Sequence, residues 1–467
     1  MGVDVQLVHV SGIDELTREE LKALVIKLHE IVQGQAERIA ELEEEVARLR
    51  GGKSSGTLCI KPSAPKKEKG PRKGRKLSFS RHALPATKAV YHALEECPEC
   101  GRKLSGGHVK WRHQVMELPQ VKVEVTDHLF VERYCGVCGK RHTPDAGMAL
   151  DGIVVGKRNV GINLMSLIAH LRTVCRMPVD QIRKLLWTLW RLKISAGEIV
   201  EILHDVAELA EGEYESLLNR IRGSPVACGD ETGWREDGAN GYLWSLSTPQ
   251  VRFYAYRKSR GSVVVKELLG TELADGGFAG SLVTDFYAAY NIYDGVKQRC
   301  WVHLLRDLKA LVEKNPDMPE IAVWVDAVND LYNRAKVAGT TEHTDHERCH
   351  LRQGFERELL DLAKPYLGVK SAVQRVLAER MERFIGELFT FVQRTEVPSE
   401  NNAAERAIRP AVVARKISGG TRSPKGSKTS SVLRSIFETW ALQGVNTLEA
   451  SRELIISANR KTCPSPA

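Results

Sequence analysis

The chain has 467 residues, enough for two to four domains, and 42% of them are apolar, which is enough for sizeable cores. Lysine and arginine (68) outnumber aspartate and glutamate (59), and the net charge of +9 favours a polyanionic partner over a neutral one. No apolar run reaches the roughly 18 residues of a membrane span, and the N-terminus has no signal-peptide pattern, so we expect a cytoplasmic protein with no membrane partner.

Residues 13–50 have the spacing of one long helix with a heptad seam. Its two apolar positions hold Val25, Val32, Ile39 and Val46, then Leu28, Leu42 and Leu49, with Gln35 as a polar break. β-Branched residues at the first position and leucine at the second favour a two-stranded parallel coiled coil, hence a homodimer or higher oligomer. An amphipathic helix packed on its own domain is the alternative.

Residues 51–90 have the composition of a basic linker rich in Gly, Ser and Pro. A single acid, Glu68, interrupts its basic run: Lys66, Lys67, Lys69, Arg72, Lys73, Arg75 and Lys76. Such a segment cannot bury a core, so we expect it to be disordered when free. It would neutralise phosphates when held against a DNA duplex; a merely solvated spacer is equally compatible.

Residues 91–150 contain two C-x-x-C-G motifs, separated by a stretch from Trp111 to Tyr134 that we expect to be rich in β-strand. The four cysteines are Cys97, Cys100, Cys135 and Cys138. Each motif predicts a tight turn that points two thiolates at one tetrahedral ion, with the glycine relieving the backbone after the second cysteine. We therefore expect a structural Zn²⁺, since a redox disulfide needs only one pair and a closed four-sulfur site leaves no open catalytic position.

Residues 157–222 have helical periodicity. The second apolar face, which follows Pro178, holds Val179, Ile182, Leu185, Leu186 and Leu189. A tight turn, Leu192–Ser195, precedes a capping-box pattern formed by Ser195 and Glu198. Two helices joined in this way resemble a helix-turn-helix that binds DNA; a simple helical spacer is the alternative.

From residue 223 to about 440 the pattern predicts a mixed α/β domain. Strands are expected at residues 226–232, 241–247, 251–256, 281–284 and 297–302, with a helix at 262–269. Three antiparallel strands, a helix, a strand, a short crossover and a last strand are the order of a ribonuclease-H-like core. Residues 306–398 have helical spacing over a length that exceeds an ordinary loop, so we expect a helical insertion, and residues 441–467 should form a C-terminal helix and tail.

Three acids fall at informative places in this domain. Asp230 lies on the first strand, Asp285 ends the fourth, and Glu405 lies on a helix that we expect to begin with Ser399 as its N-cap. Neighbours on a strand point to opposite faces, so Glu231 cannot share a site with Asp230. Glu400 is the fallback third acid.

Carboxylates in this arrangement fit phosphodiester chemistry. Two Mg²⁺ ions (or Mn²⁺) about 3.5–4 Å apart stabilise the charge on the attacking and leaving oxygens, and such hard cations take carboxylate ligands. Asp230 would bridge both ions, and Asp285 and Glu405 would each hold one. Basic residues beside the third acid are candidates for phosphate contact: Arg406, Arg409, Arg415, Lys416, Arg422, Lys425 and Lys428.

At these motifs the chain resembles a DDE transposase of the insertion-sequence 66 (IS66) family. The most specific segments are G-D-E-T-G-W (229–234), V-T-D-F-Y-A-A-Y-N (283–291), K-Q-R-C-W-V-H-L-L-R-D-L (297–308), N-N-A-A-E-R-A-I-R-P (401–410) and A-R-K-I-S-G-G-T-R-S (414–423). The resemblance covers most of the chain. It implies metal-dependent cleavage and strand transfer at the ends of a bacterial mobile element, with double-stranded DNA and accessory transposition proteins as partners.

The resemblance also marks Asp230, Asp285 and Glu405 as the acidic triad. Cys300 and His303 form a C-x-x-H pair like one that follows the second acid in several transposase groups, and we expect it at a strand-to-helix junction. Asn402 is a further accessory residue, together with Arg406 and Arg409. Glu400 departs from the family, which often has Asp before the paired asparagines.

Two other functions remain open from the sequence. The chain could be a catalytically inactive DNA-binding regulator of transposase ancestry, although the three acids argue against this. It could also be a ribonuclease-H-like nuclease that cleaves without joining.

Overall fold

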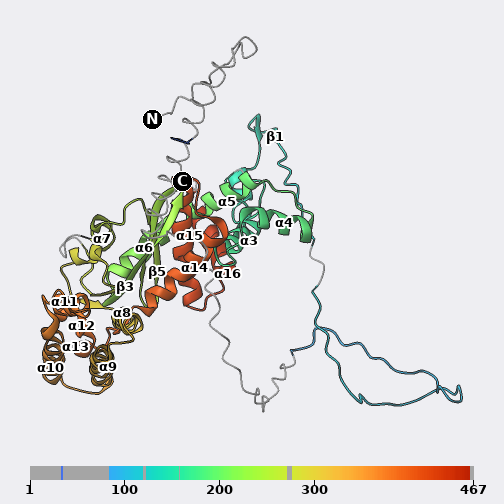
Figure 1. The fold of residues 1–467 in the computed structure, drawn as a ribbon. Coiled ribbons are helices and arrows are strands. Elements are labelled where there is room, and N and C mark those ends of the chain that lie inside the picture. Colours follow the sequence, from blue (N-terminus) through green and yellow to red (C-terminus); the bar gives the residue numbers. More distant parts are fainter. Residues whose placement is uncertain (1–32, 35–83, 119–121, 157, 271–275, 463–467) are drawn as a thin grey trace, which may run out of the picture. The chain divides into compact units, whose positions relative to one another are not determined.

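The computed structural model describes residues 33–34, 84–118, 122–156, 158–270 and 276–462 (Figure 1). The predicted coiled coil lies outside the described residues apart from Gln33 and Gly34, which are helical, and the predicted linker lies outside them up to residue 83. The chain divides into two compact units, residues 1–117 and 118–467. Among the described residues, no helix is both long enough and apolar enough to cross a membrane.

The stretch that was expected to be rich in β-strand is irregular. Of the described residues between Trp111 and Glu132, none belongs to a helix or strand. The alternating apolar residues are exposed, Val125 and Leu129 each by 84%, because no partner layer covers them. Two short antiparallel strands then surround the second cysteine motif, β1 (Arg133–Cys135) and β2 (Lys140–His142), and α2 (Ala146–Ala149) follows.

Four helices form the next layer. They are α3 (Ile162–Thr173), α4 (Val179–Trp190), α5 (Ala196–Leu209) and α6 (Glu211–Arg222). The hydroxyl of Ser195 caps α5 by accepting a hydrogen bond from the backbone N–H of Glu198 at 3.0 Å. Leu189 does not belong to the buried face of α4 as expected, since it is 57% exposed near the end of the helix.

A five-stranded mixed sheet lies at the centre of the second unit, in the order β5-β4-β3-β6-β7. Its strands are β3 (Val226–Glu236), β4 (Ala239–Ser247), β5 (Arg252–Arg257), β6 (Ser281–Thr284) and β7 (Lys297–Arg299). The first three pair antiparallel, and β6 and β7 continue the sheet parallel to β3. The predicted mixed α/β class is confirmed, but β7 ends at Arg299 rather than at residue 302, because a helix begins at Trp301.

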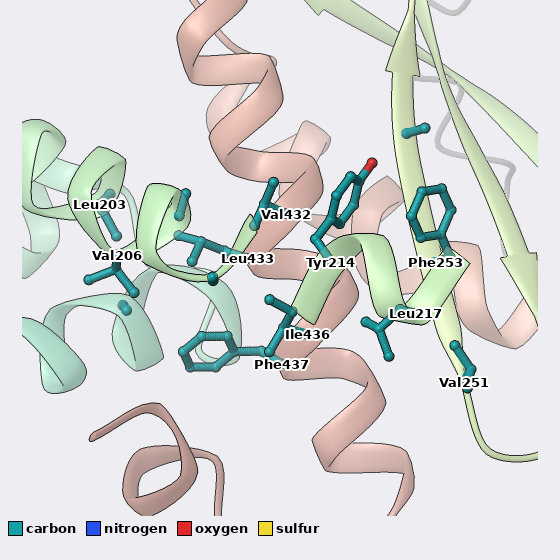
Figure 2. Close-up of a cluster of buried hydrophobic side chains, with 14 of the residues drawn as sticks. Leu203, Val206, Tyr214, Leu217, Val251, Phe253, Val432, Leu433, Ile436 and Phe437 are labelled. Atoms are coloured by element: carbon teal, nitrogen blue, oxygen red, sulfur yellow. The ribbon is translucent and has the colours of Figure 1, made fainter. Parts of the chain in front are cut away.

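Helices cover both faces of this sheet. On one face α14 (Asn402–Ser418) packs on β3, where Ala404 joins Cys228 and Val283 in a small apolar cluster. The opposite face belongs to the main core, which includes α6, α7 (Ser262–Leu269) and the 3-10 helix η3 (Ala288–Ile292). Figure 2 shows part of that core, where Phe253 of β5 and Tyr214 of α6 face the apolar side of α15 (Pro424–Leu442).

The edge strand β5 is protected by hydroxyl groups from α15. Ser431, Ser435 and Thr439 recur every four residues and so share one face of the helix. They accept hydrogen bonds from the backbone N–H groups of Tyr256, Tyr254 and Arg252 at 3.0, 2.8 and 3.0 Å, respectively. An exposed edge would be a template for pairing with another chain, and these contacts remove it. The last helix is α16 (Thr447–Thr462).

The segment between β7 and α14 is helical (Figure 1). It has its own apolar core. It contains α8 (Trp301–Lys314), α9 (Pro319–Thr340), α10 (Asp345–Ala363), η4 (Lys364–Tyr366), α11 (Arg375–Arg383), α12 (Ile385–Leu388) and α13 (Thr390–Gln393). Trp301 anchors it: the indole stacks on Tyr332 and donates a hydrogen bond to the carbonyl of Leu388 at 2.6 Å. Helix therefore begins five residues before the predicted start of the insertion at residue 306.

Candidate active site

Asp230 and Asp285 lie at the same level of the sheet. Strands β3 and β6 run parallel with Cys228 opposite Val283, and each acid lies two residues further along its chain. The carboxylate of Asp230 accepts a hydrogen bond from the backbone N–H of Glu231 at 2.8 Å. The carboxylate of Asp285 accepts one from the N–H of Tyr287 at 2.9 Å, just beyond the strand.

Glu405 reaches the same region from α14. It lies in the first turn of this helix, next to Ala404, which packs on Cys228 of β3. The pKa of Asp230 is raised to about 7, first by burial, then by the negative charge of Glu231, and further by those of Asp285 and Glu405. The charges of both other predicted acids, Asp285 and Glu405, therefore contribute to the raised pKa of Asp230.

The side chain of Glu231 lies on the other face of the sheet, where two partners hold it. Its carboxylate accepts a hydrogen bond from the hydroxyl of Tyr290 at 2.7 Å and pairs with the guanidinium of Arg260, also at 2.7 Å. Burial raises the pKa of Glu231, while these two partners lower it. This geometry agrees with the choice of Asp230 as the acid that shares a face with α14.

The C-x-x-H pair lies where β7 passes into α8. Cys300 is the N-cap residue of α8, and burial raises the pKa of its thiol. His303 lies one turn into the helix, with Nε2 3.6 Å from Oε1 of Glu405, and Arg306 lies 4.0 Å from the same oxygen. The pair thus contacts the element that carries the third acid.

Asn401 is the connecting residue that the sequence reasoning undervalued. It is 1% exposed, its side-chain amide donates to the carbonyl of Gly229 at 2.8 Å, and its backbone N–H donates to Sγ of Cys300 at 3.1 Å. It is also the N-cap of α14, which corrects the expectation for Ser399; that hydroxyl instead contacts Tyr332 at 3.0 Å. The adjacent Asn402 is the first residue of α14 and is half-buried. The sequence feature that could have identified Asn401 is the pair of adjacent asparagines, Asn401 and Asn402.

The basic residues of this region divide into two groups. Arg406 and Arg409 are exposed on α14 beside Glu405, and Lys416 and Arg422 are also exposed further along the chain. Arg415 instead binds β3, donating to the hydroxyl of Thr232 at 3.2 Å and to the carbonyl of Gly233. Lys425 and Lys428 pair with glutamates of α5 and α6. The first two are the better candidates for phosphate contact.

The three acids are carboxylates, the ligand type that divalent cations take, but their side chains are not gathered around a common point. Oxygen-only carboxylate donors suit hard cations such as Mg²⁺, and a cation would offset the repulsion that raises the pKa of Asp230. Within the described part of the chain, no three His, Cys, Asp or Glu side chains are gathered into a group that could hold an ion as it stands. The side chain of Glu405 is 37% exposed, so it has room to turn.

Two buried atoms beside these acids are unpaired. Among the described side chains, Oδ1 of Asn401 and Nδ1 of His303 have no hydrogen-bond partner. Buried polar atoms of this kind call for a water or a ligand.

The two cysteine motifs adopt the same turn. Gly101 donates its N–H to the carbonyl of Cys97 at 2.8 Å, and Gly139 donates to that of Cys135 at 2.9 Å. Both glycines have positive φ, 71° and 67°, as expected for the residue after the second cysteine. Backbone N–H groups of Glu99 and Cys100 lower the pKa of Cys97, and those of Cys138 and Val137 lower that of Cys135. Each turn therefore favours a thiolate, and the two turns belong to different units.

Comparison with known proteins adds two findings. The family model described as "Transposase IS66 family" matches residues 157–429, which include the sheet, the three acids and the helical insertion. The chain is also 27% identical over 211 residues to an uncharacterised protein, y4jO, of Sinorhizobium fredii. That match covers 42% of this chain and 62% of the relative's length.

Proposed function

Because the chain belongs to the IS66 family of transposases, we propose that it is a DDE-type enzyme that cuts and joins DNA strands at the ends of a bacterial insertion sequence. The observation that carries the proposal is the register of β3 and β6, which sets Asp230 and Asp285 level with each other, together with the packing of α14, which carries Glu405, on β3. The strand order, with three antiparallel strands extended by two parallel ones, supports a ribonuclease-H-like core for this chemistry.

In this proposal the three acids hold two Mg²⁺ ions (or Mn²⁺), which when bound stabilise charge on the attacking and leaving oxygens of the phosphodiester. The chain's own groups supply position. Asn401 ties α14 to the residue before Asp230, so that Glu405 and Asp230 keep a fixed relation. The exposed Arg406 and Arg409 bind phosphates beside the acids. Water is the nucleophile for cleavage, and a freed 3′-hydroxyl is the nucleophile for joining.

The test is a strand-transfer assay with duplexes from the ends of the element, in Mg²⁺ and in EDTA. A transposase gives cleaved strands and joined product in Mg²⁺ alone. Cleaved strands without joined product would instead identify a nuclease. Duplex binding without either product would identify an inactive regulator.

The remaining modules serve DNA handling in this proposal. The heptad seam of residues 13–50 pairs two copies so that both element ends are held together, and accessory transposition proteins join the assembly. The basic linker, the cysteine module and the helices of 157–222 contact double-stranded DNA. Cys97, Cys100, Cys135 and Cys138 bind one structural Zn²⁺; the glycine turns and the lowered pKa values of Cys97 and Cys135 support this assignment.

Replacing Cys97 by serine should lower the zinc content of the purified protein and weaken duplex binding several-fold. A tetrahedral site that loses one of four thiolates loses most of its affinity for the ion. The thermal transition of the catalytic core should stay unchanged. Zinc is measured by mass spectrometry of the protein and affinity by fluorescence anisotropy.

The matched control is Cys175→Ser, which removes an exposed free cysteine that lies in neither motif. Equal zinc content and equal affinity in the Cys97→Ser and Cys175→Ser proteins would contradict the zinc assignment.

A further inference from the structure

Helix α4 presents an aromatic residue between basic ones on its outer face. Residues 180, 183, 184, 187 and 191 follow helical spacing, and they are Asp180, Arg183, Lys184, Trp187 and Arg191. Trp187 is 42% exposed, although the inner residues of the same helix, Ile182 and Leu186, are fully buried. The helix is therefore held by its inner face, and the outer tryptophan is free for another contact.

The indole of Trp187 forms a cationic platform together with the turn that follows. The guanidinium of Arg191 lies 5.4 Å and the ammonium of Lys193 5.6 Å from the ring centroid. Both distances fit cation–π contacts. A shallow pocket of about 500 Å³ opens beside the ring, lined by Arg183, Lys184, Trp187, Leu192, Lys193, Ile194 and Ser195.

The backbone conformation of Arg191 is a further unusual feature of this platform. This residue ends α4 in the left-handed conformation, with φ of 54°, where glycine is the unstrained choice. Arginine at this position keeps a guanidinium over the ring at the cost of backbone strain.

We propose that this surface, Arg183, Lys184, Trp187, Arg191 and Lys193, binds the sugar–phosphate backbone of duplex DNA. Four cations face a single acid, Asp180, which pairs with Arg183 and Lys184 at 2.6 and 2.8 Å. These pairs are half-exposed and weak, so both cations can turn to phosphates. The indole offers an apolar face for deoxyribose. The inference rests on the proposed function, since it takes DNA as the partner.

Of the two helices, α4 is the one that can meet a polyanion. It carries the cationic platform, whereas the charged residues of α5 are acidic (Glu198, Glu201, Asp205 and Glu208), and α5 packs on α3 and α15. The platform then fixes the register of the protein on the duplex, a role that phosphate contacts generally have.

The test uses a short fluorescein-labelled duplex of random sequence without added Mg²⁺ or Mn²⁺, so that binding is measured without cleavage and the structural Zn²⁺ is not chelated. The double variant Arg183→Gln/Lys193→Gln should bind about tenfold more weakly, and the slope of log affinity against log salt should fall by about two, since each lost phosphate contact removes about 0.9. The control Arg334→Gln/Lys370→Gln removes the same charge from exposed positions of the helical insertion and should leave the slope unchanged.

Two further variants separate recognition from folding. Arg191→Gly should raise the melting temperature by relieving the turn, yet weaken duplex binding. Trp187→Ala should weaken binding several-fold, and Trp187→Phe should restore most of it by keeping an aromatic face. These readouts stand whether or not the acids catalyse strand transfer.

Unchanged affinity and salt slope in Arg183→Gln/Lys193→Gln, relative to its control, would overturn the proposal. So would a loss of affinity that accompanies a smaller mass by light scattering, because the surface would then be an interface between protein chains.

Discussion

Replacing Asp230 by asparagine should abolish DNA cleavage and joining by at least about a thousandfold, and it should also stabilise the metal-free protein. The first effect follows from the proposed role of Asp230 as the carboxylate that holds both ions, since an amide is a poor ligand for a hard cation. The second effect follows from the cost of keeping this carboxylate charged in a buried site among Glu231, Asp285 and Glu405.

The sign of the stability effect is fixed by the direction of the shift. Folding raises the pKa of Asp230 from its ordinary value of 3.8 to about 7. Below pH 4 the residue is protonated in both states and costs nothing. Between pH 4 and 7 the folded state must retain a proton that the unfolded state releases, so the penalty grows, and above pH 7 it is complete. An asparagine at position 230 is uncharged at every pH and so avoids this penalty.

The gain in the free energy of unfolding should therefore be about 1–3 kcal/mol at pH 8, less than the full shift implies because the site is partly solvated. This gain in stability should vanish near pH 4. Thermal unfolding of both proteins in EDTA measures the gain, and added Mg²⁺ should reduce the difference between them by stabilising the wild type alone.

The control for Asp230→Asn is Asp294→Asn, at an exposed aspartate before β7. It should change neither activity nor stability. Glu405→Gln should be as inactive as Asp230→Asn, whereas Glu400→Gln should retain activity. An active Asp230→Asn protein would refute the proposed triad, and an inactive one with unchanged stability would refute only the electrostatic argument.

Local sequence patterns predicted the sheet well because its strands are set by near neighbours. A short run that ends at Asp285 placed β6 at Ser281–Thr284, and the chain pattern placed a short helix, α7, at Ser262–Leu269. Parallel pairing of β3 with β6 then puts Asp285 level with Asp230, a consequence of strand order alone. That part of the candidate site was predictable.

Other details depend on contacts between residues far apart in the chain. Ser399 has the residue type of an N-cap, but its hydroxyl contacts Tyr332 and its carbonyl accepts from the N–H of Trp301. Asn401 takes the cap position, and its amide donates to the carbonyl of Gly229 on the adjacent strand β3. Leu189 has the right spacing for the core, yet α4 ends before a neighbour covers it. The spacing of residues along the sequence does not show which distant residue a side chain will contact.

Replacing Arg299 by methionine should lower the free energy of unfolding by about 3–5 kcal/mol, the range for breaking a buried charge network. Arg299 is fully buried and donates to Glu387 at 2.6 Å, to the side chain of Asn291 at 2.6 Å and to the carbonyl of Asp285 at 2.8 Å. One guanidinium thus joins the insertion, the crossover after β6 and the backbone of the second acid. Methionine fills a similar volume and satisfies none of these groups.

The fork shape of Arg299 is as important as its charge. Arg299→Lys keeps the cation but has no planar fork, so it should recover only part of the lost stability. Arg334→Met, which breaks exposed pairs with Asp330 and Glu358, should cost only about 1 kcal/mol. If Arg299→Met costs as little as this control in urea unfolding, the network is not a structural anchor. If it costs the expected amount, cleavage by the remaining folded protein should also fall, because the carbonyl of Asp285 has lost its tether while Asp230 keeps its place on β3.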